Sequence, residues 1–240
     1  MALKARNIPK VGGKGSGMPK QPTMEPGTYP SRVVQVIDMG LQPQRPYKGE
    51  PKNPAYELMV TYECLDEFCV DENGVEMEDK PRWISETFPL HNIEADLAKS
   101  TKRYKALDPD MVYDGDWGEV VGTPCMVTTV NNVSGDNVYT NVASVTSMRA
   151  RDAAKAPELI NEPKVFSLDE PDVDVFRSFP QWIQDKIKGN LEYDGSALQK
   201  ALEGAPKQEE KKGKANPRVE EENAQEDFVD DVQGDDDIPW

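Results

Sequence analysis

The sequence predicts a mainly β protein: a five-stranded barrel with one helix between its third and fourth strands, followed by a helical appendage and an acidic tail. Three observations support this prediction. Strand-like runs recur between positions 26 and 148, one helical pattern interrupts them, and like charges gather at the two ends of the chain. We therefore expect a folded middle between two unstructured ends.

The first three strands are predicted between residues 28 and 88. The segment 28–41 is β-branched and apolar, and a Pro26-Gly27 turn signal precedes it. The segment 71–79, around Asn73-Gly74, is expected to be a polar turn, and 82–88 the third strand. In the second strand, 56–64, apolar and polar residues alternate with period two. The residues predicted to share one face are Tyr56, Leu58, Val60, Tyr62 and Cys64.

One helix and two further strands follow. Asn92 suits an N-cap, the basic residues that follow suit the C-terminal end of a helix near Lys105, and Pro109 marks the stop. The segments 120–131 and 138–148 are predicted to form a hairpin. Three strands, a helix and two strands is the order of the OB-fold, a partly open Greek-key barrel. We assign this domain to residues 26–150.

The chain changes character after Met148. Residues 151–205 are predicted to form a linker and a helical appendage, with an amphipathic helix at 175–188 and a further turn or two at 196–203. Two interpretations stay open for its apolar face. It packs Trp182 and Ile183 onto the barrel, or it serves self-association or a protein partner.

Charge and composition exclude several classes of protein. The 240 residues hold 44 acidic and 28 basic side chains, for a net charge of −16. The first 24 residues contain five Lys and Arg and no acid, whereas the last 22 contain ten acids and no Lys or Arg. We expect a flexible basic arm at 1–25 and a disordered acidic tail at 206–240. The absence of a long apolar run and of a secretory h-region argues against membrane and secreted proteins.

Few residues suggest catalysis or a cofactor. The sequence has one histidine, His91, and lacks a Gly-rich phosphate loop, an HExxH motif and a nucleophile elbow. The spacing of its three cysteines does not resemble a zinc knuckle, and Cys64 and Cys125 lie on predicted strands, where small core residues are common. An odd, sparse set of cysteines favours reduced thiols in the cytoplasm. We expect neither an enzyme nor a metal or cofactor site.

A site for single-stranded nucleic acid has more support. Such sites combine basic side chains that follow the phosphates with aromatic rings on which bases stack. On an OB-fold they lie over strands two and three and the loops beside them. The candidate residues, taken from the first loop, the third strand, the helix and the end of the fifth strand, are Arg45, Tyr47, Lys48, Lys52, Arg82, Trp83, Lys99, Lys102, Arg103 and Arg149.

Alternatives remain for several of these candidates. Trp83 is equally consistent with a core residue, and the basic residues of the helix with a solvated face. Tyr47 lies in a loop too polar and Pro-rich for a core aromatic. Phosphate repels a protein of net charge −16, but local charge decides binding, and without its last 22 residues the chain carries only −6. The acidic tail can itself compete for a basic strip.

Several segments resemble a known family. GTYPSRVVQVID, PRWISETFPLH, STKRYKALDP and VVGTPCMVTTVNN, within residues 26–205, are similar to phage-encoded single-stranded DNA-binding proteins of the OB-fold type. The resemblance implies a protein that coats and protects single strands during phage DNA replication, recombination and repair, in the host cytoplasm.

The end of the chain resembles a second pattern, the acidic tip of bacterial single-stranded DNA-binding proteins, which ends Asp-Asp-Asp-Ile-Pro-Phe. The matching residues are Asp235, Asp236, Asp237, Ile238, Pro239 and Trp240. This resemblance implies that the tip recruits a polymerase, helicase or nuclease. The departure is Trp240 in place of Phe, which needs a larger pocket.

Two rival functions differ in class from single-strand binding. An acidic interaction protein or DNA mimic would act through its negative charge without binding DNA. A structural protein would use the barrel and appendage for homo-oligomerisation.

Overall fold

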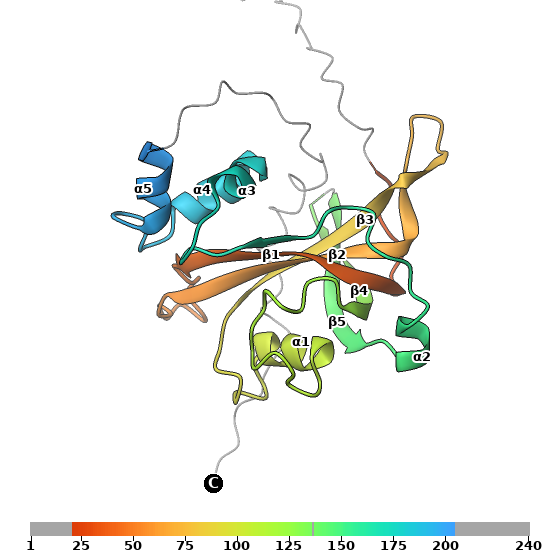
Figure 1. Cartoon of the computed structure of the whole chain (residues 1–240), viewed down its shortest axis with the longest axis horizontal. Helices are drawn as coiled ribbons and strands as arrows, with labels where there is room; N and C mark the ends of the chain where they lie inside the picture. The colour runs from red at the N-terminus through yellow and green to blue at the C-terminus, as the bar shows by residue number, and fades with distance from the viewer. Residues whose placement is uncertain (1–20, 136, 205–240) are drawn as a thin grey trace, which may run out of the picture.

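A computed structural model describes residues 21–135 and 137–204 (Figure 1). Its strands are β1 (Thr28–Gln42), β2 (Ala55–Val70), β3 (Glu76–Pro89), β4 (Pro124–Ser134), β5 (Asn137–Ser147) and β6 (Lys164–Phe166). Its helices are α1 (Lys99–Leu107), α2 (Ala150–Ala153), α3 (Val173–Ser178), α4 (Gln181–Lys188) and α5 (Ala197–Gly204). The protein is therefore mainly β, with few and short helices.

The strands form one sheet in the order β3-β2-β1-β4-β5. Neighbours along this path are antiparallel, and the short β6 pairs with β1 in parallel. The path ends at β3 and β5 and is not closed into a ring of hydrogen-bonded strands. The predicted succession of three strands, a helix and two strands along the chain is confirmed; the predicted five-stranded barrel is not, because the sheet is open.

The β2–β3 hairpin is longer than the alternation predicted. β2 continues to Val70 and β3 begins at Glu76, so residues 76–79, expected in the turn, belong to a strand. The turn itself lies at Asn73-Gly74, where Gly74 has a φ of +78°. The Asp71 carboxylate accepts the N–H groups of Asn73 and Val75, which fixes this turn.

The inner face of the sheet carries the first apolar core. Leu58, Val60 and Tyr62 of β2 share this face, as the period-two alternation predicted, and all three are buried there. Tyr56, at the start of the same row, is exposed. Tyr104 of α1 packs into the same cluster, because α1 lies against this face of the sheet (Figure 1). The helix is shorter than expected: it starts at Lys99, and Asn92 caps only a local turn by accepting the Glu94 N–H.

The outer face of β1 and β2 carries a second apolar core. Ile37, Met39 and Met59 are buried there against β6 and the C-terminal helices, including Ile183 of α4. In Figure 1, α3, α4 and α5 lie on the opposite side of β1 and β2 from α1. Of the two interpretations of the appendage, packing onto the sheet is the one that the structure shows.

The appendage contains two helices where the sequence predicted one over 175–188. α3 ends at Ser178 and α4 begins at Gln181. The break falls at Phe179-Pro180, because proline has no N–H to donate and disfavours a helical conformation of the residue before it. The two short helices still bury Phe176 and Ile183 in one cluster.

The N-terminal segment contacts β2, β3 and β4. The Gln21 side chain exchanges two hydrogen bonds with the Val70 backbone, and Arg82 of β3 donates to the Pro22 carbonyl. Asn131 of β4 donates to the carbonyl of Met24, whose side chain is only 3% exposed. The last residues of the expected arm, 21–25, therefore belong to the fold, and 1–20 lie outside the described residues.

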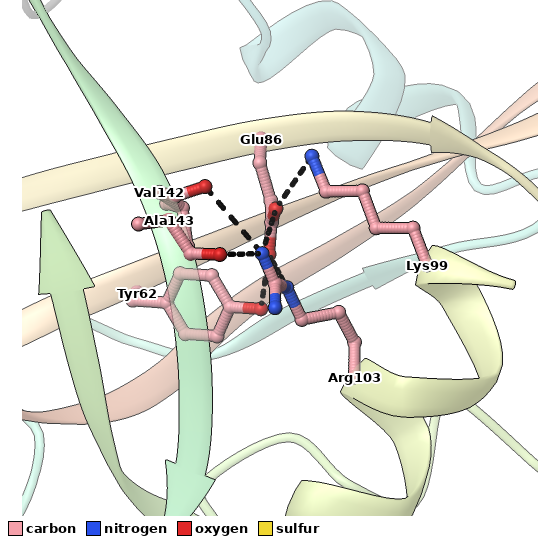
Figure 2. Close-up of polar contacts among 6 residues, drawn as sticks. All are labelled: Tyr62, Glu86, Lys99, Arg103, Val142 and Ala143. Carbon is pink, nitrogen blue, oxygen red and sulfur yellow. Dashed lines mark hydrogen bonds and ion pairs between the residues drawn. The ribbon is translucent and has the colours of Figure 1, made fainter. Parts of the chain in front are cut away.

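Arg103 of α1 joins the two strands at which the sheet path ends (Figure 2). Its guanidinium donates to the Glu86 carboxylate of β3 at 2.8 Å and to the carbonyls of Val142 and Ala143 of β5 at 3.4 and 3.2 Å. The β4–β5 register shifts at this point, so Ala143 lies at a bulge in β5. A side chain thus spans the gap between the two strands.

Two further groups complete the contact around Glu86. The Tyr62 hydroxyl donates to the carboxylate at 2.9 Å, and the Lys99 ammonium lies 3.0 Å from its other oxygen. Burial, with the negative charge of Glu86 beside it, raises the pKa of Tyr62 well above its usual value. The tyrosine therefore stays a neutral hydrogen-bond donor.

Replacing Arg103 by alanine should destabilise the fold strongly. The change leaves the Glu86 carboxylate buried without its main counter-charge, and breaking a buried pair costs about 3 kcal/mol or more. The free energy of unfolding from urea denaturation checks this. The matched control is Lys102→Ala on the exposed face of the same helix, which should change it by less than about 0.5 kcal/mol. Equal effects of the two variants would contradict the role given to Arg103.

Candidate nucleic-acid interface

The first loop, residues 43–54 between β1 and β2, carries an exposed aromatic ring with two cations over it. Tyr47 and Glu50 exchange two backbone hydrogen bonds of 2.9 Å, and both residues between them, Lys48 and Gly49, have positive φ. This tight turn leaves Tyr47 41% exposed. The ammonium groups of Lys48 and Lys52 lie 5.2 and 5.0 Å from the centre of its ring, within the range of cation–π attraction.

The base of this loop is held by the C-terminal helices. The Glu57 carboxylate accepts the Gln44 amide at 2.7 Å and pairs with Lys186 of α4 at 3.0 Å. The Tyr56 hydroxyl donates to Glu192 at 3.0 Å. At the end of β1, the Gln42 amide donates to the Lys186 carbonyl at 3.1 Å. Because both strand ends that carry the loop are anchored, the tip around Tyr47 projects from a fixed base.

Trp83 lies on the outer face of β3. It is opposite Glu63 in the β2–β3 register, and its indole N–H donates to the Glu63 carboxylate at 3.0 Å. The indole is half-buried and belongs to neither apolar core. Its neighbours Arg82 and Ile84 point to the other face, since successive side chains alternate. Trp83 therefore does not share a face with Arg82.

Three of the predicted basic residues make internal contacts. Arg82 and Arg103 are buried, the first against the Pro22 carbonyl and the second against Glu86. Lys99 pairs with Glu86 and lies over the ring of Phe88. The contacts of Arg103 and Lys99 with Glu86 stabilise the joint between β3 and β5, and they reduce the charge that α1 presents to a ligand.

The two remaining basic candidates lie away from the first loop. Lys102 is exposed on α1, as expected for a solvated helix face. Arg149 lies beside α2, on the wall of a cavity of about 540 Å³, and pairs with Asp152 at 2.6 Å. The structure thus brings together Arg45, Tyr47, Lys48 and Lys52 in one loop, and it does not gather the other candidates around them.

Sequence reasoning missed the contribution of the C-terminal segment to this region. Lys186, Glu192 and Asn161 contact residues of β2 more than 95 positions away, and no local pattern predicts such contacts. One signal was available in β1. Its apolar residues occupy both alternating positions, as in Val33-Val34 and Val36-Ile37, which is typical of a strand covered on both faces.

A scan against protein-family models gives no match, and a search of curated proteins also finds none. Within residues 21–135 and 137–204, no group of three or more His, Cys, Asp and Glu side chains is arranged to hold a metal ion. No helix in the part of the chain that the structure describes is long and apolar enough to cross a membrane. The predicted partner-binding residues 235–240 lie outside the described residues.

Mild acetylation of lysines should distinguish the loop from the helix. Lys48 and Lys52 are exposed, whereas Lys99 is half-buried and paired with Glu86. We expect Lys48 and Lys52 to react several times faster than Lys99, as measured by peptide mass spectrometry of the native protein. Lys102 is the exposed reference on α1. Equal acetylation rates at Lys48, Lys52 and Lys99 would contradict the pairing of Lys99 with Glu86.

Proposed function

We propose that this protein binds single-stranded DNA through an OB-fold and recruits partner proteins through its acidic C-terminal tip. The order β3-β2-β1-β4-β5, with α1 between β3 and β4, is consistent with the Greek-key order of that fold. Contacts of Arg103 with β3 and β5 bring the two end strands together, as a partly open barrel requires. Binding of this kind needs no catalytic group.

The observation that carries the proposal is the aromatic ring and cations of the first loop. Loops beside strands two and three form part of the ligand face of OB-folds. A base can stack on the exposed ring of Tyr47 while Lys48 and Lys52 move from the ring to neighbouring phosphates. A surface cation–π contact contributes only about 0.5–1 kcal/mol, whereas base stacking contributes about 1–3 kcal/mol.

The charge of the described region favours one rival function. Residues 21–204 hold 18 Lys and Arg against 32 Asp and Glu, an excess of acid that repels phosphate. An acidic protein that occupies the basic site of another protein would have the same excess. The two functions differ in a direct way: the rival predicts no binding to DNA, whereas local attraction at residues 43–54 predicts binding that weakens steeply with salt.

Binding to fluorescent oligo-dT, measured by anisotropy at low and moderate salt, separates these functions. The full chain should bind oligo-dT in preference to duplex DNA. A version that ends at Arg218 should bind more tightly, because it lacks ten competing carboxylates. Absence of binding by both versions would contradict the proposal and favour the acidic interaction protein.

The role of the loop can be tested with a pair of matched tyrosine variants. Tyr47→Ala should weaken oligo-dT binding by about tenfold, the loss expected for one stacked base. Tyr113→Ala is the control: Tyr113 is equally exposed, at 40% against 41%, but lies in a loop rich in aspartate. If both variants bind as the unaltered protein does, Tyr47 is not a stacking platform.

A further inference from the structure

Four N–H donors from two distant segments meet at the Glu63 carboxylate of β2. The Trp83 indole donates at 3.0 Å, and the backbone N–H groups of Ile160 and Asn161 donate at 2.7 and 3.3 Å. The Asn161 side-chain amide donates the fourth bond at 2.6 Å. Glu63 itself is only 1% exposed. A buried carboxylate so fully engaged holds its partners in one geometry.

The segment that supplies three of these donors is anchored a second time. Arg32 of β1 is the cross-strand partner of Glu63, and its guanidinium donates to the carbonyls of Ala156 and Pro157 at 3.1 and 2.7 Å. Residues 156–161, which we name the crossing segment, therefore run over the outer face of β1 and β2 and are fixed by two charged side chains. The crossing segment is thus part of the sheet's outer face.

The crossing segment and the C-terminal helices determine which residues of β2 and β3 a ligand can contact. Met59 and Thr61, the other outward-facing residues of β2 in this region, are buried. Their partners across the register, Thr87 and Ser85, remain half-buried on the outer face of β3, in line with Trp83. The accessible strip of the β2–β3 face therefore belongs to β3, and Trp83 is its aromatic member.

We propose that Glu63 is a positioning residue for base stacking on Trp83. The inference rests on the proposed single-strand binding and adds the crossing segment to that site. The hydrogen bond directs the polar edge of the indole into the protein and prevents rotation of the ring. A base then meets a platform that is already oriented, so less conformational entropy is lost on binding. The four donors also disperse the negative charge of Glu63, which would otherwise repel phosphate.

A double-mutant cycle on oligo-dT binding tests this role. Trp83→Ala should weaken binding about tenfold, as for one lost stack. Glu63→Gln should weaken binding about threefold in the otherwise unaltered protein, because a neutral amide oxygen holds the indole N–H less strongly than a carboxylate does and the new NH2 group opposes the Ile160 N–H. In the Trp83→Ala background, Glu63→Gln should have no further effect, because Glu63 is buried and its charge is balanced by four donors, so that it acts on the DNA through the indole.

Two further variants test whether the loss of binding comes from the Trp83 hydrogen bond and not from a general effect on folding. Trp83→Phe keeps a ring but removes the N–H, so it should reproduce the threefold loss and should not add to that of Glu63→Gln. Asn161→Ala removes one donor and leaves the Trp83 bond, so it should weaken binding less than twofold. Without DNA, Glu63→Gln should also shift the indole N–H resonance of Trp83 and speed its exchange with solvent.

The outcomes separate the two proposals. If Glu63→Gln weakens oligo-dT binding as much in the Trp83→Ala background as in the unaltered protein, the two losses of binding free energy are additive. That result would overturn the positioning role and leave single-strand binding intact. An unchanged Trp83 indole resonance in Glu63→Gln would overturn the positioning role as well. Failure of the unaltered protein to bind oligo-dT would overturn the proposed function, and the role of Glu63 with it.

Discussion

The fold depends on one buried charged contact, the bridge that Arg103 makes between Glu86 of β3 and the carbonyls of β5. The sheet path ends at these two strands, and the end strands of a sheet present unpaired backbone groups. One guanidinium satisfies two of these carbonyls and balances the Glu86 carboxylate at the same time. Arg103 belongs to α1, the helix inserted between β3 and β4. The position of α1 in the chain therefore places the guanidinium where the two end strands meet.

The C-terminal segment imposes a second constraint, because it covers one face of the sheet. β6 and α3 to α5 bury the outer side of β1 and β2, and the crossing segment is tied to Arg32 and Glu63. The same segment anchors the base of the first loop through Lys186. What remains open to a ligand is the tip of that loop and the outer row of β3. Residues 150–204 are therefore part of the domain that they cover.

Sequence reasoning predicted the parts of the fold that local pattern determines. Period-two alternation placed Leu58, Val60 and Tyr62 on one face of β2, although both faces of that strand are buried. The polar, Pro-rich composition of residues 43–54 indicated that Tyr47 is not a core ring, and it is 41% exposed. Sequence reasoning did not predict the destination of Arg103, because charge on a helix face does not reveal whether a carboxylate 17 residues earlier faces it. Nor did it predict the surroundings of Glu63, which accepts from both Trp83 and Asn161, because Asn161 is 98 residues from Glu63 along the chain.

Ultraviolet crosslinking of the full chain to oligo-dT, followed by peptide mass spectrometry, shows which aromatic rings lie against bases. We expect the crosslinked peptides to contain Tyr47 and Trp83, because we propose that bases stack on these two rings. We expect no crosslink at Tyr113, which is as exposed as Tyr47 but lies among aspartates. Crosslinks confined to other aromatics, or a complete absence of crosslinks at low salt, would show that the protein does not bind single strands through these rings.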